Sequence, residues 1–222
     1  MSYTSVQPVS AMQQEFAEGL RKLKTAALIY IISALLVGLG FTAAMMSGLS
    51  GMGGVVFGGI GLLAAAILGA ILGLIALFGF LIPAFSHLKN ADPSAFGTSA
   101  TLVKIGYAVG FILFIIALAL IASVVATGNP GMVFGGLGLF VLGAIFLLIG
   151  LIGVAIGMFR LKDKTGETLF LVAGILFIIG IFIGILQFIA WILVFVGANS
   201  ALNKLSSMPP QAQGYVAPPP PR

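Results

Sequence analysis

The chain has 222 residues, of which 60% are hydrophobic and only 7% are charged. An ordinary soluble domain has about a quarter charged residues, so this composition excludes a soluble globular fold and favours a protein embedded in a lipid bilayer. The net charge of +5 comes from Lys and Arg beside apolar segments, where lipid head groups explain it, and no nucleic-acid partner is expected. Because the sequence has no cysteine, disulfides and thiolate chemistry are also excluded.

The polar N-terminal segment is predicted to have two parts. Residues 1–9 are expected to be a flexible tail, and residues 10–25 an amphipathic helix that lies at the membrane interface. The apolar face of this helix is formed by Phe16, Leu20 and Leu23. Its basic end, which is expected to anchor the helix to head groups, is formed by Arg21, Lys22 and Lys24.

Five long apolar segments follow, and each exceeds the roughly 20 residues that a helix needs to cross about 30 Å of hydrocarbon. They cover residues 26–46, 55–85, 101–126, 133–159 and 168–198. Together they predict an all-α integral membrane protein, a five-transmembrane-helix bundle over residues 26–205, followed by a disordered Pro-rich tail over residues 206–222. No acidic residue or histidine lies inside the five segments, so the usual signature of a proton or ion pathway is missing.

The fifth segment, residues 168–198, is longer than one straight crossing needs and carries Gly180 and Gly184 near its middle. We interpret it as one tilted or kinked helix, because each half alone is too short to cross the bilayer. The alternative is a broken pair of helices that returns the C-terminal tail to the side from which the segment started.

Positive charge alternates between the loops of this predicted bundle. Lys and Arg lie in the N-terminal segment and at the loops 86–100 and 160–167, whereas the loops 47–54 and 127–132 carry none. The interface-anchoring residues of the loop before the fifth segment are Arg160, Lys162 and Lys164. The positive-inside rule therefore places the N-terminus in the cytoplasm. Five crossings of the plasma membrane then place the C-terminal tail outside, together with Lys204.

An internal repeat relates the later segments. Residues 56–62 (VFGGIGL) recur as residues 133–139 (VFGGLGL), and residues 110–116 (GFILFII) resemble residues 174–179 (GILFII). We therefore predict that the hairpin of the second and third spans is duplicated as the fourth and fifth, in the same orientation. Such a parallel repeat differs from the inverted repeats that many transporters use.

Glycine is the patterned residue of the spans. Small residues at intervals of three, four or seven let helix backbones approach closely and gain contacts that lipid cannot provide. The predicted helix-packing glycines are Gly61, Gly69, Gly73, Gly106, Gly110, Gly136, Gly143, Gly150, Gly153, Gly157, Gly180 and Gly184. They indicate close packing within one bundle, or self-association where a glycine face is left over. Gln187, the most polar side chain deep in a span, is predicted to form an intramembrane polar contact.

Residues that could support catalysis are sparse. The single histidine, His87, has no second His and no Cys with which to hold a metal ion. The sequence also contains no Ser–His–Asp set, no HExxH motif and no Gly-rich loop with Lys. We therefore predict no catalytic, metal-binding or cofactor-binding residues, and we expect that the protein is not an enzyme.

Two stretches of sequence carry a family resemblance. The segment 18–24 (EGLRKLK) runs straight into the first span, and residues 165–180 read TGETLFLVAGILFIIG. In both features the chain resembles a family of uncharacterised archaeal multi-pass membrane proteins. The resemblance covers most of residues 16–205 and implies an archaeal plasma membrane, but it implies no activity and brings no catalytic residues.

These observations favour a non-enzymatic structural or accessory membrane protein that acts through helix–helix association in the lipid bilayer. Its partner is expected to be another membrane protein or a second copy of the same chain. The alternative is a permease or channel for a neutral or apolar solute. That alternative requires a cavity lined by polar groups such as Ser33, Thr42, Ser123 and Gln187.

Overall fold

The computed structural model describes residues 9–48, 52–127, 129 and 131–207, and every regular element in this part of the chain is helical, as predicted. The elements are α1 (Val9–Gly48), α2 (Met52–Leu74), the π-helical segment η1 (Ile75–Leu81), α3 (Ile82–Ala91), α4 (Pro93–Thr127), α5 (Gly131–Thr165), α6 (Thr168–Ile179) and α7 (Gly184–Ser207). The two predicted tails, residues 1–9 and 206–222, lie outside the described residues except where they join α1 and α7.

Five helices of the described chain are long and apolar enough to cross a membrane. They cover Ala11–Ser47, Gly58–Ala91, Pro93–Ser123, Gly131–Thr165 and Gly184–Ser207. The second of them runs from α2 through η1 into α3 without a break, because a π-helical turn keeps the backbone hydrogen-bonded within the segment. The prediction of five long apolar helices is confirmed, although the fifth is not the helix that the sequence pattern suggested.

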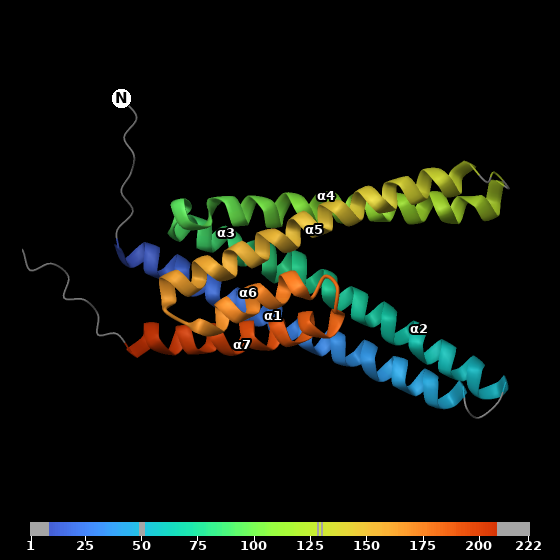
Figure 1. Cartoon of the computed structure of the whole chain (residues 1–222), viewed down its shortest axis with the longest axis horizontal. Helices are drawn as coiled ribbons and strands as arrows, with labels where there is room; N and C mark the ends of the chain where they lie inside the picture. The colour runs from blue at the N-terminus through green and yellow to red at the C-terminus, as the bar shows by residue number, and fades with distance from the viewer. Residues whose placement is uncertain (1–8, 49–51, 128, 130, 208–222) are drawn as a thin grey trace, which may run out of the picture.

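Three antiparallel helix pairs make up the molecule: α1 with α2, α4 with α5, and α6 with α7 (Figure 1). The first two pairs meet at one end and diverge toward their hairpin tips, which gives the molecule the outline of a V. The α6–α7 pair is shorter, and it packs with α6 against α5 and with α7 against α1. The hydrophobic core lies where the three pairs meet, and its largest fully buried side chains include Phe85, Phe96, Phe170 and Phe177.

The first helix corrects one prediction. α1 is a single helix of 40 residues, so the segment 10–25 continues into the first span and is not a separate helix on the membrane surface. Its apolar face meets protein: Leu20 and Leu23 are fully buried, and the Phe16 ring centroid lies 6.3 Å from that of Phe96 in α4. Burial against neighbouring helices, which the sequence pattern cannot distinguish from burial in lipid, explains the difference.

The segment 168–198 corrects a second prediction, because it is two helices and not one. α6 has 12 residues and ends at Ile179, and α7 begins at Gly184 after a turn. Twelve residues of helix span about 18 Å, which is less than the roughly 30 Å of the hydrocarbon core. A Cβ atom on Gly180 would lie 2.6 Å from Cγ of Gln187, so this close turn favours glycine. The chain follows the broken-pair alternative, and the end of α7 returns to the end of the molecule where α1 begins (Figure 1).

Glycine sets the distance between α4 and α5. A Cβ atom on Gly106 would lie 2.2 Å from the backbone nitrogen of Gly150, and one on Gly143 would lie 3.1 Å from the backbone oxygen of Gly110. At these two points the backbones touch directly, whereas at Gly150 the Tyr107 ring fills the space that the glycine leaves. Such contact gains dispersion energy over a long interface that lipid chains cannot reproduce.

Replacing Gly106 with alanine tests this close contact between α4 and α5. The added methyl group meets backbone atoms of α5, which cannot move aside as a flexible side chain would, so we expect destabilisation of about 1–3 kcal/mol. The measurement is the thermal unfolding midpoint of the purified protein in detergent. Gly138→Ala is the matched control, since no heavy atom lies within 4 Å of the position of its added Cβ. Equal midpoints for the two variants would contradict the packing role of Gly106.

Candidate functional site

All charged residues of the described chain lie toward one end of the molecule, which we call the charged end. They belong to the first part of α1, the corner between α3 and α4, the end of α5, the start of α6 and the end of α7, and these parts lie together (Figure 1). The helix ends at the opposite end of the molecule are Gly48, Met52, Thr127 and Gly131, and the sequence from 48 to 52 and from 127 to 131 contains no charged residue. Lys204, which the five-crossing prediction placed on the opposite side, belongs to the charged end because α7 returns to it.

Ion pairs join helix ends within the charged end. The Lys164 ammonium at the end of α5 lies 2.5 Å from the carboxylate of Asp92, between α3 and α4. Lys204 near the end of α7 lies 2.5 Å from Glu167, which precedes α6 and also accepts a hydrogen bond from Ser200. The hydrogen bond from Lys164 holds the pKa of Asp92 well below its ordinary value, and the hydrogen bond from Lys204 lowers the pKa of Glu167. Both carboxylates are therefore charged at neutral pH, and both pairs are formed.

The six basic residues predicted to anchor the protein at the interface divide into two groups. Four of them lie within 4.0 Å of a carboxylate: Arg21, Lys22, Lys162 and Lys164. The other two, Lys24 and Arg160, have no carboxylate partner among the described residues. Lys24 instead donates a hydrogen bond of 2.7 Å to Oδ1 of Asn199, and its ammonium lies 5.5 Å from the centre of the Phe195 ring.

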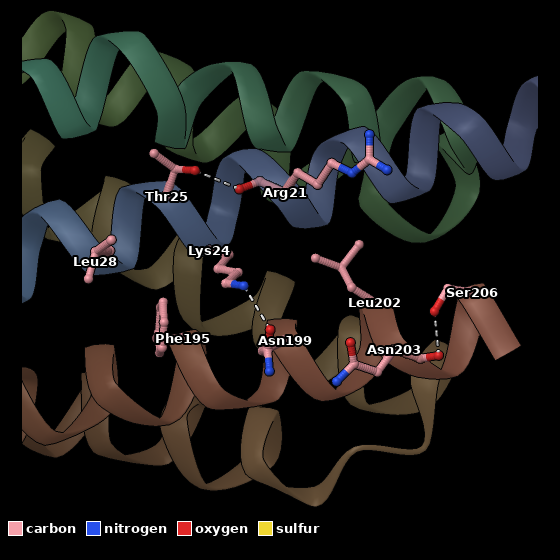
Figure 2. A pocket seen from close by; sticks show the side chains of 9 residues that line it. All are labelled: Arg21, Lys24, Thr25, Leu28, Phe195, Asn199, Leu202, Asn203 and Ser206. Atoms are coloured by element: carbon pink, nitrogen blue, oxygen red, sulfur yellow. Dashed lines mark hydrogen bonds between the residues drawn. The ribbon is translucent and has the colours of Figure 1, made fainter.

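A pocket of about 470 Å³ opens beside Lys24, between α1 and α7. Figure 2 shows the side chains that line it, which are Arg21, Lys24, Thr25, Leu28, Phe195, Asn199, Leu202, Asn203 and Ser206. Sequence reasoning missed this pocket, because a single helix over residues 168–198 would carry the end of α7 to the opposite side of the membrane. Only the return of α7 places its amides beside the basic residues of α1.

A second cavity, also of about 470 Å³, lies among the apolar parts of α1, α4, α5 and α7. Its polar lining consists of Tyr30, Ser33, Tyr107 and Gln187. Ser33 donates a hydrogen bond of 2.8 Å to the backbone oxygen of Gly69 in α2, whereas the two tyrosine hydroxyls and the glutamine amide have no hydrogen-bond partner within the described chain. Trp191 stacks on Tyr30 with ring centroids 4.4 Å apart and forms one wall.

The polar residues required by the permease alternative are only partly brought together. Gln187 lines the second cavity, as does Ser33. Thr42 is not part of that lining, and it donates a hydrogen bond to the backbone oxygen of Gly38 within α1. Ser123 is also absent from the lining and donates to the backbone oxygen of Leu120 within α4. The predicted intramembrane contact of Gln187 is a packing contact with Gly180, since its amide makes no hydrogen bond with the described residues.

The structure separates the twelve predicted packing glycines into two groups. At nine of them an added Cβ atom would come within 3.1 Å of another heavy atom: Gly69, Gly106, Gly110, Gly136, Gly143, Gly150, Gly153, Gly157 and Gly180. The other three, Gly61, Gly73 and Gly184, have no such atom within 4 Å, so a Cβ atom added there would meet open space in the described chain. Sequence reasoning missed four glycines that pack as closely, because most of them stand outside the regular stripes: Gly19, Gly40, Gly58 and Gly174.

Acidic residues and histidine do not gather into a metal-binding cluster in the part of the chain that the structure describes. His87 of α3 lies with Nδ1 2.7 Å from a carboxylate oxygen of Glu15 in α1, so the single histidine joins two helices at the charged end. The side chains of His87 and Glu15 are each about one-third exposed or less, and their contact joins α3 to α1.

The five apolar helices of membrane-spanning length, with every described charge gathered at one end, define a multi-pass helical membrane protein that associates with the lipid bilayer. Within that class, the chain belongs to the DUF973 family of proteins of unknown function, whose profile matches residues 17–222. Comparison with curated proteins and with solved structures gave no match.

Proposed function

We propose that this protein is a non-enzymatic structural or accessory membrane protein that acts through helix–helix association, with another membrane protein or with a second copy of itself. The main evidence for this proposal is the composition of the outward face of α2. Small residues recur along it at intervals of seven, four and three: Gly59, Ala66, Ala70 and Gly73. The two alanines are exposed, and no heavy atom lies within 4 Å of a Cβ atom built on either glycine.

The contrast with the rest of the molecule supports this reading of α2. On its inner face, Gly58 packs against Ala44 and Gly69 packs against Val37, both in α1. The glycine stripe of α5 is likewise filled, by α4 along most of its length and by Phe85 of α3 at Gly157. A smooth helix face left without a neighbour gains contacts when another protein helix covers it, because backbones can then approach more closely than lipid chains allow.

The double variant Gly59→Ile and Gly73→Ile tests the association. Each new side chain stands in open space within one chain, so the fold should keep its stability, whereas a neighbouring helix on this face would be pushed away. The protein is purified from native membranes in mild detergent, and we expect the wild type to retain a stoichiometric partner or to form an oligomer that the variant loses.

Gly138→Ile is the matched control, because it adds the same side chain at an equally open position on α5. We expect it to purify as the wild type does. A wild type that is recovered alone as a monomer would overturn the proposal, and so would equal losses in the control and the double variant.

We also propose that the protein resides in an archaeal plasma membrane with both termini in the cytoplasm. In this arrangement α1, α2–η1–α3, α4 and α5 cross the bilayer, and the α6–α7 pair enters it and returns. The supporting observation is that every described Lys and Arg lies at the charged end, as the positive-inside rule requires of one cytoplasmic face. This replaces the expected external position of the C-terminal tail.

Single cysteine variants test the arrangement, since the chain has no native cysteine. We expect a cysteine at Ser207, the last residue of α7, to resist a membrane-impermeant thiol reagent in intact cells and to react after permeabilisation. A cysteine at Asn129, between α4 and α5, is the comparison and should react from outside. Labelling of the Ser207 variant in intact cells would refute the return of the chain to the cytoplasm.

The internal duplication stays a prediction. Residues 56–62 and 133–139 occupy matching places, near the hairpin tips at the starts of α2 and α5. The partners that follow differ, because α4 has 35 residues and α6 only 12. If the two hairpins share an origin, the second copy has lost its full-length crossing helix and gained a turn at Gly180.

A permease or channel for a neutral or apolar solute is the second candidate, and the cavity between α1, α4, α5 and α7 favours it. This cavity holds two tyrosine hydroxyls and one amide that have no hydrogen-bond partner in the described chain, and such groups can orient a weakly polar solute. Its apolar walls exclude a role for strongly charged solutes, because nothing in the lining compensates a charge.

The variant Gln187→Leu separates the two functions. In a permease it should reduce flux of a neutral solute into liposomes by roughly tenfold or more, because a buried polar contact of 1–3 kcal/mol is lost. In a protein that acts by association it should leave co-purification unchanged and alter the unfolding midpoint only slightly. Thr42→Val is the control, since its hydroxyl bonds within α1 and does not line the cavity; equal flux in the wild type and both variants would exclude the permease function for this cavity.

A further inference from the structure

We propose that the pocket between α1 and α7 is a specific binding site for the phosphate group of an anionic phospholipid. The site is independent of the helix association proposed above, because it lies at the charged end and not on the outward face of α2. Four observations support it. The positive charge of Lys24 has no carboxylate partner in the described chain, its ammonium group is held in position, further hydrogen-bond donors lie nearby, and the lining changes from polar to apolar along the pocket.

The first observation is that no acidic residue is left to neutralise Lys24. The chain has five Asp and Glu residues, and each lies within 4.0 Å of another basic group. The pairs are Glu15–His87, Glu18 with Arg21 and Lys22, Asp92–Lys164, Asp163–Lys162 and Glu167–Lys204. Lys24 therefore presents a partly buried positive charge, which an anion can neutralise.

The second observation is that the Lys24 ammonium is held in place. Its hydrogen bond to Oδ1 of Asn199 is 2.7 Å long, and the Phe195 ring lies beneath it at 5.5 Å. An ammonium group has three donors, so two remain after the bond to Asn199. A positioned cation loses less side-chain entropy on binding than one that moves freely in solvent.

Further donors surround this ammonium group. The Arg21 side chain is 71% exposed, and its contact with Glu18 is a loose one of 3.9 Å, so its guanidinium can turn to an anion in the pocket. The side-chain amide of Asn203 lines the pocket and has no hydrogen-bond partner among the described residues. An arginine fork, an ammonium and an amide together suit the several oxygens of a phosphate.

The polarity of the lining distinguishes a lipid from a free phosphate ion. Figure 2 shows Arg21 and Ser206 at one end of the pocket, Lys24 and Asn199 further along, and Leu28 and Phe195 beyond them toward the apolar part of α1 and α7. A phosphate among the basic residues would leave the apolar end uncovered. A hydrocarbon chain linked to that phosphate through glycerol would cover it and continue into the bilayer, which is the order of groups in a phospholipid.

The experiment measures lipid binding by the full chain in a neutral detergent. Phosphatidylglycerol, phosphatidylcholine and inorganic phosphate are added separately, and bound lipid is detected by native mass spectrometry and by the shift of the unfolding midpoint. We expect phosphatidylglycerol to bind and stabilise the protein, phosphatidylcholine to bind at least about tenfold more weakly because its choline cancels the charge, and inorganic phosphate to cause no shift.

Three variants locate the site. Lys24→Gln and Arg21→Gln should each weaken phosphatidylglycerol binding by about tenfold, since each removes a charge-assisted hydrogen bond. Arg21 is largely exposed, so its variant keeps the test valid if Lys24→Gln disturbs the fold by losing the bond to Asn199. Lys162→Gln is the control, because it removes the same charge from the same end of the molecule but does not line the pocket.

Unchanged binding in Lys162→Gln together with weaker binding in the two pocket variants supports the site. Equal weakening in all three variants would reduce the effect to net charge and overturn the proposal. Equal affinity for phosphatidylcholine would overturn the requirement for an anionic lipid, and stabilisation by inorganic phosphate alone would show a free-phosphate site in its place.

Discussion

The exclusion of charge from hydrocarbon is the constraint on which the rest of this structure depends. An ionised side chain in the bilayer is costly, so every described charge lies at one end, and there each of the five carboxylates pairs with a basic group. The pairs Asp92–Lys164 and Glu167–Lys204 join helix ends that are far apart in sequence. Exposed ion pairs stabilise a fold only weakly one by one. Here they connect helix ends from different parts of the chain at the charged end.

Beyond the charged end the helices are held mainly by close packing, to which the hydrogen bond from Ser33 to the backbone oxygen of Gly69 adds a polar contact between α1 and α2. Lipid surrounds them, so burial of apolar area supplies no net drive toward association, and close backbone contact must supply it. The α4–α5 pair achieves this contact along its length through glycines such as Gly106 and Gly150. The α1–α2 pair uses fewer glycines, and the two pairs diverge toward their tips (Figure 1). The faces turned toward lipid are consequently where a partner helix could add contacts.

The short α6–α7 pair connects packing to the two candidate sites. Its turn at Gly180 sends α7 back along α1, and the returning helix forms a wall of both pockets. At the level of the apolar core, Gln187 and Trp191 face Tyr30 and the cavity between four helices. At the charged end, Asn199 meets Lys24. One return of the chain thus forms part of both the cavity among the apolar helices and the pocket at the charged end.

The sequence by itself determined the class of protein, because long apolar runs and the position of charges follow directly from the thickness and polarity of the bilayer. It also located most of the glycines at helix contacts, since their spacing reflects helical periodicity. It could not decide whether residues 168–198 cross once or turn back, because a glycine pair permits either path and the choice depends on what packs against it. Tertiary structure alone decided the return of α7, the burial of Leu20 and Leu23 in protein, and the meeting of Lys24 with Asn199, since each depends on contacts between residues distant in the chain.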